Sequence, residues 1–313
     1  MKPMSYVERE VMISGEISNS LGALWRDYLE LCKPNVVALM LLTSLIGMLL
    51  AVPGMVPWQV LIFGNFGIAL CAASAATVNH IVDQHIDLTM KRTMNRPVAQ
   101  GRISNFHAIV YAAVLGVSGM LVLKIFTNDL TMWLTFGALI GYAGIYTGFL
   151  KRATPQNIVI GGLAGAVPPL LGWTAVTDQI QGHALLLVLI IFAWTPPHFW
   201  ALAIHRRDDY AKAKIPMMPV THGIKLTALH VVLYTLMLIA ITLLPFVTGM
   251  FSWLYLIGAL VLGFGFLYRS VQLYRGKKNA GMDAFKYSII YLMALFVIML
   301  SDHYLLPMPP MRG

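Results

Sequence analysis

Long apolar runs recur along this sequence, and they constrain its fold more than any other feature. A helix needs roughly 20 apolar residues to cross the hydrocarbon core of a bilayer. The runs predict about nine membrane-spanning helices, at residues 35–53, 58–82, 105–126, 130–149, 157–176, 183–204, 226–247, 252–272 and 285–304. Only 11% of the residues are charged, against roughly 25% in soluble domains. The composition excludes an ordinary water-soluble enzyme and predicts an all-α, polytopic membrane helical bundle.

The basic residues are distributed unequally between alternate links of these spans. Lys and Arg number 22 and Asp and Glu 13, and every basic residue except Lys124 and Arg312 lies on one side of the expected topology. Positive charge is retained on the cytoplasmic side of a membrane. The pattern therefore predicts a multi-pass protein of the bacterial cytoplasmic (inner) membrane, with its N-terminus and long loops in the cytoplasm and its C-terminus outside. The basic excess then requires no nucleic-acid partner.

The chain is expected to form one membrane domain preceded by a short polar segment. Residues 1–32 mix both signs of charge and lack the apolar stretch and cleavage site of a signal peptide. We expect them to form a cytoplasmic N-terminal segment, and residues 33–313 to form a single transmembrane domain. Cys32 and Cys71 are too few for a disulfide framework and are expected to be reduced thiols.

The second span ends in three oxygen-bearing side chains at equal spacing. Asn79, Asp83 and Asp87 are four residues apart, so on a helix they share one face. Two carboxylates and an amide oxygen suit Mg²⁺, which also binds the phosphate oxygens of a substrate. Ionisable groups at membrane depth are costly unless they are used. The alternative is a solvated helix end in which Asp87 pairs with Lys91.

Several cations follow these acids within one loop. Lys91, Arg92, Arg96 and Arg102 all lie in the link between the second and third spans. Acidic residues followed by cations suit a metal together with a polyanion, because guanidinium groups match phosphate oxygens in pairs. The alternative for any one of them is a positive cytoplasmic loop without a ligand.

A second polar region follows the sixth span. His198, His205, Asp209 and Lys212 are expected to share one helix face, with Asp208 as a substitute for its neighbour. This set is expected to complete a metal and phosphate site or to transfer protons. The alternative for His198 is a packed, hydrogen-bonded side chain.

The fifth span is rich in residues that allow close helix packing. Its small and helix-breaking residues are Gly161, Gly162, Gly165, Pro168, Pro169 and Gly172. Packing against other helices is the favoured interpretation, and a broken helix that lines a ligand cavity is the alternative. Lys151, Arg152 and Asn157 at its cytoplasmic entrance are candidates for contacts with an anion or with metal-bound water.

These motifs together resemble the UbiA superfamily of intramembrane prenyltransferases. The resemblance lies in the N-x-x-x-D-x-x-x-D spacing of Asn79–Asp87, the nine spans and the second polar loop. Further matching segments point to members whose acceptor is haem, and they read KPNVV, DLTMKRTMNRPVAQGRIS, YTGFLKRATPQNIVIGGLAGAVPPLLGW, WTPPHFWALAI and DDYAKAKIPMMP. Quinone-forming members of the family have a second motif rich in Asp, whereas here His198 and His205 lie with Asp209.

The resemblance implies a reaction and a set of roles. Farnesyl would pass from farnesyl diphosphate to a vinyl group of haem B, followed by addition of water, to give haem O for a terminal oxidase or a further haem-modifying enzyme. Asn79, Asp83 and Asp87 would hold Mg²⁺, with Asp208 and Asp209 as further ligands. The cations that would bind the diphosphate are Lys91, Arg92, Arg96, Lys151, Arg152 and Lys212. Asp83, Asp87, His198 and Asp209 would be the catalytic residues, the last two as candidate bases.

Two other interpretations remain at this point. The first is a prenyltransferase that acts on an aromatic quinone precursor, which would work without haem. The second is a transporter of haem or of an organic anion. Transporters place polar groups near the bilayer midplane, whereas here they gather at one end of the spans.

Overall fold

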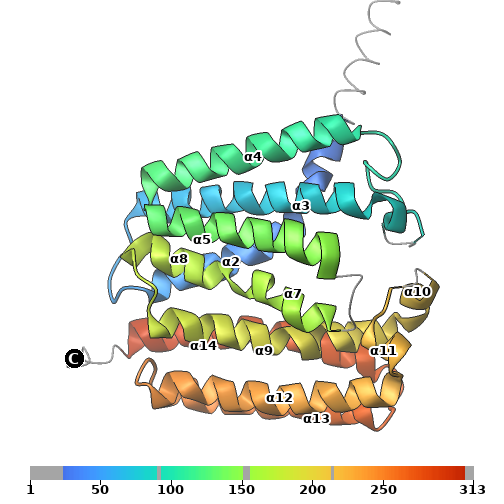
Figure 1. Cartoon of the computed structure of the whole chain (residues 1–313). Coiled ribbons are helices and arrows are strands. Elements are labelled where there is room, and N and C mark those ends of the chain that lie inside the picture. Colours follow the sequence, from blue (N-terminus) through green and yellow to red (C-terminus); the bar gives the residue numbers. More distant parts are fainter. Residues whose placement is uncertain (1–23, 90–92, 151–155, 213–214, 307–313) are drawn as a thin grey trace, which may run out of the picture.

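The protein is a bundle of helices that lie side by side (Figure 1). The computed structural model describes residues 24–89, 93–150, 156–212 and 215–306, and every regular element in these ranges is helical. After the helix Leu24–Leu31, the elements are α2 (Pro34–Leu50), η1 (Val60–Gly64), α3 (Asn65–Asp87), α4 (Asn105–Phe126), α5 (Asp129–Ile140), η2 (Gly141–Leu150), α7 (Asn157–Ala166), α8 (Pro168–Thr177), α9 (Gly182–His205), α10 (Arg207–Lys212), α11 (Met218–Thr221), α12 (Ile224–Val247), α13 (Trp253–Tyr274) and α14 (Ala280–Leu305).

The number of spans agrees with the sequence. Within the described ranges, 8 helices are long and apolar enough to cross a membrane, and a ninth results if the helix Leu24–Leu31 and α2, bent by 46°, form one span. The prediction of a polytopic all-α bundle is confirmed. Three of the predicted spans are each built from two elements, η1 with α3, α5 with η2, and α7 with α8. The last division falls at Pro168, which has no N–H with which to continue the hydrogen bonding of α7.

Glycines allow α2 and α8 to pack backbone to backbone. A Cβ at Gly47 would collide with the backbone of Pro169, and a Cβ at Gly172 would collide with the backbone of Ser44. Small residues at such crossings let membrane helices approach closely. The packing interpretation of the fifth span is therefore confirmed at Gly172, whereas a Cβ at Gly165 would meet nothing within 4 Å.

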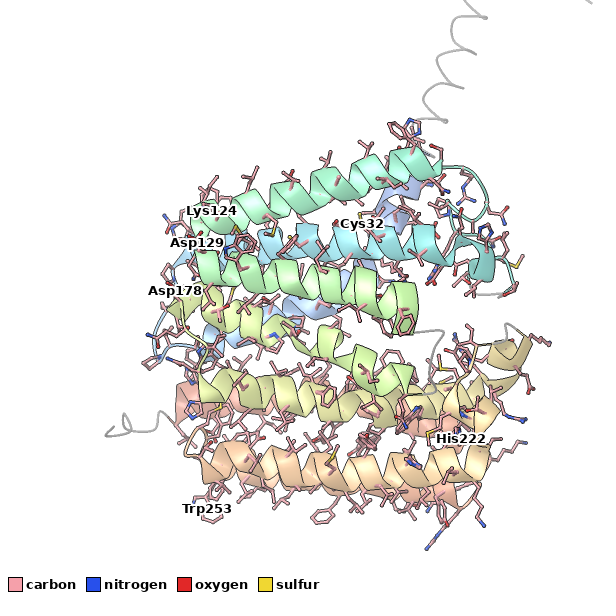
Figure 2. The ribbon with its side chains drawn as sticks, viewed as in Figure 1. Cys32, Lys124, Asp129, Asp178, His222 and Trp253 are labelled. Atoms are coloured by element: carbon pink, nitrogen blue, oxygen red, sulfur yellow. The ribbon has the colours of Figure 1, made fainter. Side chains whose placement is uncertain are left out.

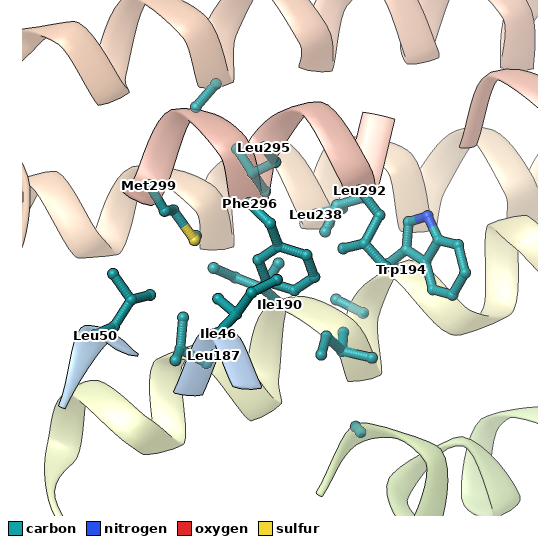
Figure 3. Close-up of a cluster of buried hydrophobic side chains, with 14 of the residues drawn as sticks. Ile46, Leu50, Leu187, Ile190, Trp194, Leu238, Leu292, Leu295, Phe296 and Met299 are labelled. Carbon is teal, nitrogen blue, oxygen red and sulfur yellow. The ribbon is translucent and has the colours of Figure 1, made fainter. Parts of the chain in front are cut away.

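The largest buried core lies where α2, α8 and α9 meet α13 and α14. Figure 3 shows Ile46, Leu187 and Phe296 from three of these helices facing one another. Many large apolar side chains are exposed on the outer faces of the helices, as Val114 and Val117 are on α4. In a chain of this composition, such surfaces suit contact with lipid.

Both predicted polar regions reach the same end of the bundle. The link from α3 to α4 and the short helices α10 and α11 lie at one end in Figure 1. Lys124, Asp129 and Asp178 lie at the opposite end, as Figure 2 shows. The fold thus separates the end that holds the candidate site from an end whose labelled side chains take no part in it.

Candidate functional site

Asn79, Asp83 and Asp87 are buried in the last turns of α3. Their exposed fractions are 4%, 1% and 3%. Asn79 donates from Nδ2 to Oδ2 of Asp83 at 2.9 Å, so the first two side chains lie along one face, as their spacing predicts. The helix ends at Asp87, which places this carboxylate at the negative end of the helix dipole. A buried carboxylate in that position needs a cation nearby.

Arg96 supplies that cation to Asp87. Its Nη1 donates to both carboxylate oxygens of Asp87, at 2.8 Å and 2.7 Å. Their side chains are only 14% and 5% exposed, so water screens the pair weakly. Thr93 also donates to the backbone carbonyl of Asp87 at 3.2 Å, which holds the start of the loop against the end of the helix. The structure therefore pairs Asp87 with Arg96.

Lys33 supplies a second cation, to Asn79. Its ammonium group donates to Oδ1 of Asn79, although the two residues are far apart in the sequence. Lys33 lies at the corner between the helix Leu24–Leu31 and α2 and adopts the left-handed conformation, with φ 50° and ψ 60°. That conformation costs a residue with a Cβ about 1–2 kcal/mol. Lys33 was not among the residues predicted for the site, and its only signal in the sequence is a lone Lys before Pro at the entrance to the first span.

The π-helical segment η2 contributes polar and aromatic side chains to the same place. Thr147 accepts a second hydrogen bond from Nδ2 of Asn79 at 3.3 Å, and it is fully buried. Tyr142 and Tyr146 stack with their ring centroids 5.6 Å apart. Both tyrosines belong to the same π-helical segment as Thr147. The α3 cluster, formed by Asn79, Asp83 and Asp87, therefore borders two stacked aromatic rings that the sequence did not reveal.

His198 is packed inside the bundle. Its ring stacks on Trp194 at 4.1 Å between centroids, and its Nδ1 lies 2.6 Å from the hydroxyl of Ser288 on α14. Trp194 donates to the backbone carbonyl of the same serine at 2.8 Å. These contacts fix the orientation of the imidazole.

The expected continuous face from His198 to Lys212 is not formed. Helix α9 ends at His205, and Arg206 leaves helical geometry with φ −107° and ψ 25°. Asp209 and Lys212 belong to the separate helix α10, where both are exposed. The prediction of one shared face was therefore wrong, because it assumed that the helix continues through residue 206.

The oxygen ligands on α3 fit Mg²⁺ that is bound together with a substrate. Mg²⁺ usually keeps several waters and takes one or two carboxylates together with substrate phosphates. The buried set of Asp83, Asp87 and the amide of Asn79 matches that requirement. No group of three or more His, Cys, Asp or Glu residues that could hold a metal is found in the described parts of the chain. Asp208 and Asp209 therefore do not join the α3 acids in a metal cluster in this structure.

Four of the predicted diphosphate contacts lie outside the described residues. These are Lys91, Arg92, Lys151 and Arg152. The suggested pairing of Asp87 with Lys91 also involves a residue outside the described ranges, so the structure does not test it. Of the remaining predicted cations, Arg96 lies at the α3 cluster and Lys212 is exposed on α10.

Comparison with known proteins identifies close relatives along most of the chain. Residues 40–298 match the model of the UbiA prenyltransferase family. A protoheme IX farnesyltransferase from Saccharophagus degradans is 70% identical over 292 residues, which cover 93% of this chain and 96% of that protein. A protein of the same name from Marinobacter nauticus is 67% identical, with 90% of this chain and 93% of that protein covered.

Solved structures with the same fold have much lower sequence identity. A structure described as digeranylgeranylglyceryl phosphate synthase has a TM-score of 0.77 and 18% identity, and covers 90% of this chain and 99% of its own. A UbiA homologue from Archaeoglobus fulgidus, bound to GPP and Mg²⁺, has a TM-score of 0.60 and 14% identity, with 87% and 99% covered. At such identities the likeness establishes the fold alone.

Proposed function

Because the chain belongs to the UbiA prenyltransferase family, we propose that it transfers farnesyl from farnesyl diphosphate to a vinyl group of protohaem IX, with addition of water, to form haem O. The observation that carries this proposal is 70% identity, over 93% of the chain, with a protein named for that transfer. The buried polar cluster on α3, with its two cations, supplies the chemistry that a diphosphate donor requires.

The donor diphosphate binds at the end of α3. Asn79, Asp83 and Asp87 would hold Mg²⁺ through their oxygens, and the metal-bound homologue from Archaeoglobus fulgidus supports a metal in proteins of this fold. A bound Mg²⁺ neutralises the negative charge that develops on the leaving diphosphate. Arg96 contacts Asp87 without the substrate. It is therefore already beside the site where its guanidinium group binds phosphate oxygens.

Further cations surround the leaving group. On the loops at this end of the bundle we assign diphosphate contacts to Lys91, Arg92, Lys151, Arg152 and Lys212. Asp208 and Asp209 are exposed on α10 in this structure, so they would act as metal ligands only in the substrate-bound enzyme. Their contribution is consequently smaller than that of the buried acids on α3.

The bond changes require an apolar enclosure and one base. The allylic C–O bond breaks, and the terminal vinyl carbon of haem forms a C–C bond with farnesyl C1. Water then adds to the adjacent carbon and loses a proton to a base, for which His198 and Asp209 are the candidates. The contact with Ser288 holds Nδ1 of His198, which leaves Nε2 as the nitrogen that accepts a proton.

The enzyme acts in the bacterial inner membrane. Its basic loops, and with them the candidate site, face the cytoplasm, and its C-terminus lies outside. Both substrates have an acidic head and an apolar body, and a site at one end of a membrane bundle suits such molecules. The product passes to a haem-copper terminal oxidase or to another haem-modifying enzyme.

The test is incubation of membranes that contain the protein with haem B, farnesyl diphosphate and Mg²⁺, followed by mass analysis of the extracted haem. We expect an adduct of one farnesyl group and one water, which EDTA abolishes. Prenylation of an aromatic acid with haem unchanged would replace haem as the acceptor. Haem uptake into sealed vesicles, with neither acceptor modified, would replace enzymatic transfer by transport.

A further inference from the structure

A pocket lies beside the α3 cluster. It has a volume of about 450 Å³. Its walls come from the helix Leu24–Leu31, the start of α2, α3 and the loop that follows α3. The lining residues are Arg26, Leu29, Glu30, Lys33, Pro34, Asn35, Val36, His80 and Arg96. Lys33 and Arg96 also contact the α3 cluster, so the pocket adjoins the proposed donor site.

The pocket carries excess positive charge. Arg26, Lys33 and Arg96 are cationic, and Glu30 is the one acidic residue among its lining residues. Arg96 is already paired with Asp87, so Arg26 and Lys33 are the cations that face the carboxylates of an acidic ligand. Arginine and lysine pair strongly with carboxylates through charge-assisted hydrogen bonds. Leu29, Pro34 and Val36 provide an apolar wall beside these cations.

His80 faces this pocket without a partner of its own. Its exposed fraction is 2%, and neither ring nitrogen has a hydrogen-bond partner among the described residues. A neutral imidazole has one donor and one acceptor, and leaving such groups buried and unsatisfied costs about 1–3 kcal/mol each. Its place in the pocket lining indicates that a ligand supplies the missing hydrogen bond.

Several contacts hold the pocket in shape. Arg102 donates to both carboxylate oxygens of Asp27, at 3.0–3.1 Å, which ties the loop to the helix Leu24–Leu31. The hydrogen bond to Asp27 raises the pKa of the Arg102 guanidinium above its ordinary value. In the same helix, Leu31 packs against Val98 and Ile103 of the loop. The pocket is thus walled by elements that are fixed to one another.

We propose that this pocket binds the two carboxylates of the porphyrin acceptor, an inference that rests on the proposed function. The donor diphosphate is assigned to the acids of α3, so the acidic head of the acceptor needs separate cations. The pocket provides Arg26, which lies outside the α3 cluster, and it shares Lys33 and Arg96 with that cluster. His80 donates its ring N–H to a carboxylate, and the apolar wall contacts the edge of the macrocycle.

The experiment measures binding of haem B and of its dimethyl ester to the purified protein in detergent, without donor. The ester keeps the ring and the iron but lacks both negative charges. We expect the wild type to bind haem at least tenfold more tightly than the ester. Arg26→Gln and His80→Leu should each weaken haem binding by about tenfold, the effect of one lost charged hydrogen bond, and weaken binding of the uncharged ester by less.

Arg275→Gln is the matched control. Arg275 is exposed after α13 and does not line the pocket, so we expect unchanged affinity for both ligands. Equal binding of haem and ester by the wild type would overturn the inference. A higher KM for farnesyl diphosphate in Arg26→Gln, with haem affinity unchanged, would assign the pocket to the donor. If only His80→Leu lost affinity for haem, and its Soret band were altered, the pocket would be assigned to binding of the haem iron.

The same preparations separate this inference from the proposed function. Haem O formation by the wild type is measured in parallel. If the wild type forms haem O and does not discriminate haem from its ester, only the carboxylate site fails. If the wild type forms no haem O under any of these conditions, the proposed function fails and the carboxylate site fails with it.

Discussion

Two polar regions reach the same end of the bundle, and they differ in how their acids are held. On α3, Asp83 and Asp87 are almost fully buried, and Asp87 is bound by an arginine. On α10, Asp208 and Asp209 are exposed. Buried acids must have a partner at every moment, whereas exposed acids are solvated by water. The comparison teaches that α3 is organised for ligand binding before any ligand arrives and that α10 is not.

The largest expected effect tests this difference directly. Asp83→Asn and Asp87→Asn should each lower kcat/KM by about 10³-fold or more, because loss of metal and phosphate stabilisation costs several kcal/mol. Asp208→Asn and Asp209→Asn should each cost about tenfold or less. All four variants are compared for haem O formation at matched amounts of folded protein. Equal losses of kcat/KM in the α3 and α10 variants would contradict the difference between the two regions.

A smaller loss should follow from changing the cation on α3. Arg96→Lys keeps the positive charge but replaces the planar guanidinium, which binds two oxygens at once, by a single ammonium group. We expect kcat/KM for farnesyl diphosphate to fall by about 100-fold. Arg102→Lys is the matched control, since Arg102 also binds an aspartate through two oxygens but its side chain is 43% exposed. A loss of the same size in the control would show that any arginine on this loop matters equally.

The second region has its own buried residue, His198. His198→Phe keeps the stacking on Trp194 but removes the ring nitrogens, and we expect kcat to fall by about 100-fold, the lower range for loss of a general base. Ser288→Ala removes the contact at Nδ1 and the serine's own hydrogen bond to the carbonyl of Phe285 but keeps both ring nitrogens, and it should cost about tenfold or less. The readouts are kcat and the water content of the product. Full activity of His198→Phe would reduce this histidine to a packing residue.

The sequence predicted those features that depend on local spacing. The spans follow from apolar runs, and the shared face of Asn79 and Asp83 follows from the helical repeat, because both are set within a few residues of chain. The same reasoning failed at Arg206, where the helix ends inside a pattern that continues. Spacing identifies a common face only as long as the helix persists.

Contacts between distant segments were not predictable from the sequence. Lys33 reaches Asn79 from 46 residues away, and Ser288 lies 90 residues from His198. Such pairs depend on how the helices cross. Glycines such as Gly172 affect these crossings because they allow two helices to pack closely. The left-handed conformation of Lys33 also arises from tertiary structure, because its local sequence favours no such geometry. The pocket that His80 lines could be recognised only from these contacts between distant segments.

The smallest effect on activity is expected at a buried acid of the opposite end. Asp302 accepts hydrogen bonds from the backbone N–H groups of Ser252 and Tyr255, both at 2.9 Å, and from the hydroxyl of Ser252 at 2.6 Å. It therefore caps the positive N-terminus of α13. Asp302→Asn puts an amide donor against one of these donors. It should lower the free energy of unfolding by about 1–3 kcal/mol and leave KM for both substrates unchanged.

Denaturation in detergent and steady-state kinetics test this prediction together, with Ser301→Ala as the control at the neighbouring position. Ser301 is not buried and bonds only to a carbonyl of its own helix, so its loss should change neither quantity. An acid that caps a helix has its oxygens satisfied by the protein, whereas Asp87 on α3 meets a cation, Arg96, that a substrate can also bind. If Asp302→Asn lowered kcat without lowering stability, burial of an acid alone would mark function, and the contrast between the two ends would have to be abandoned.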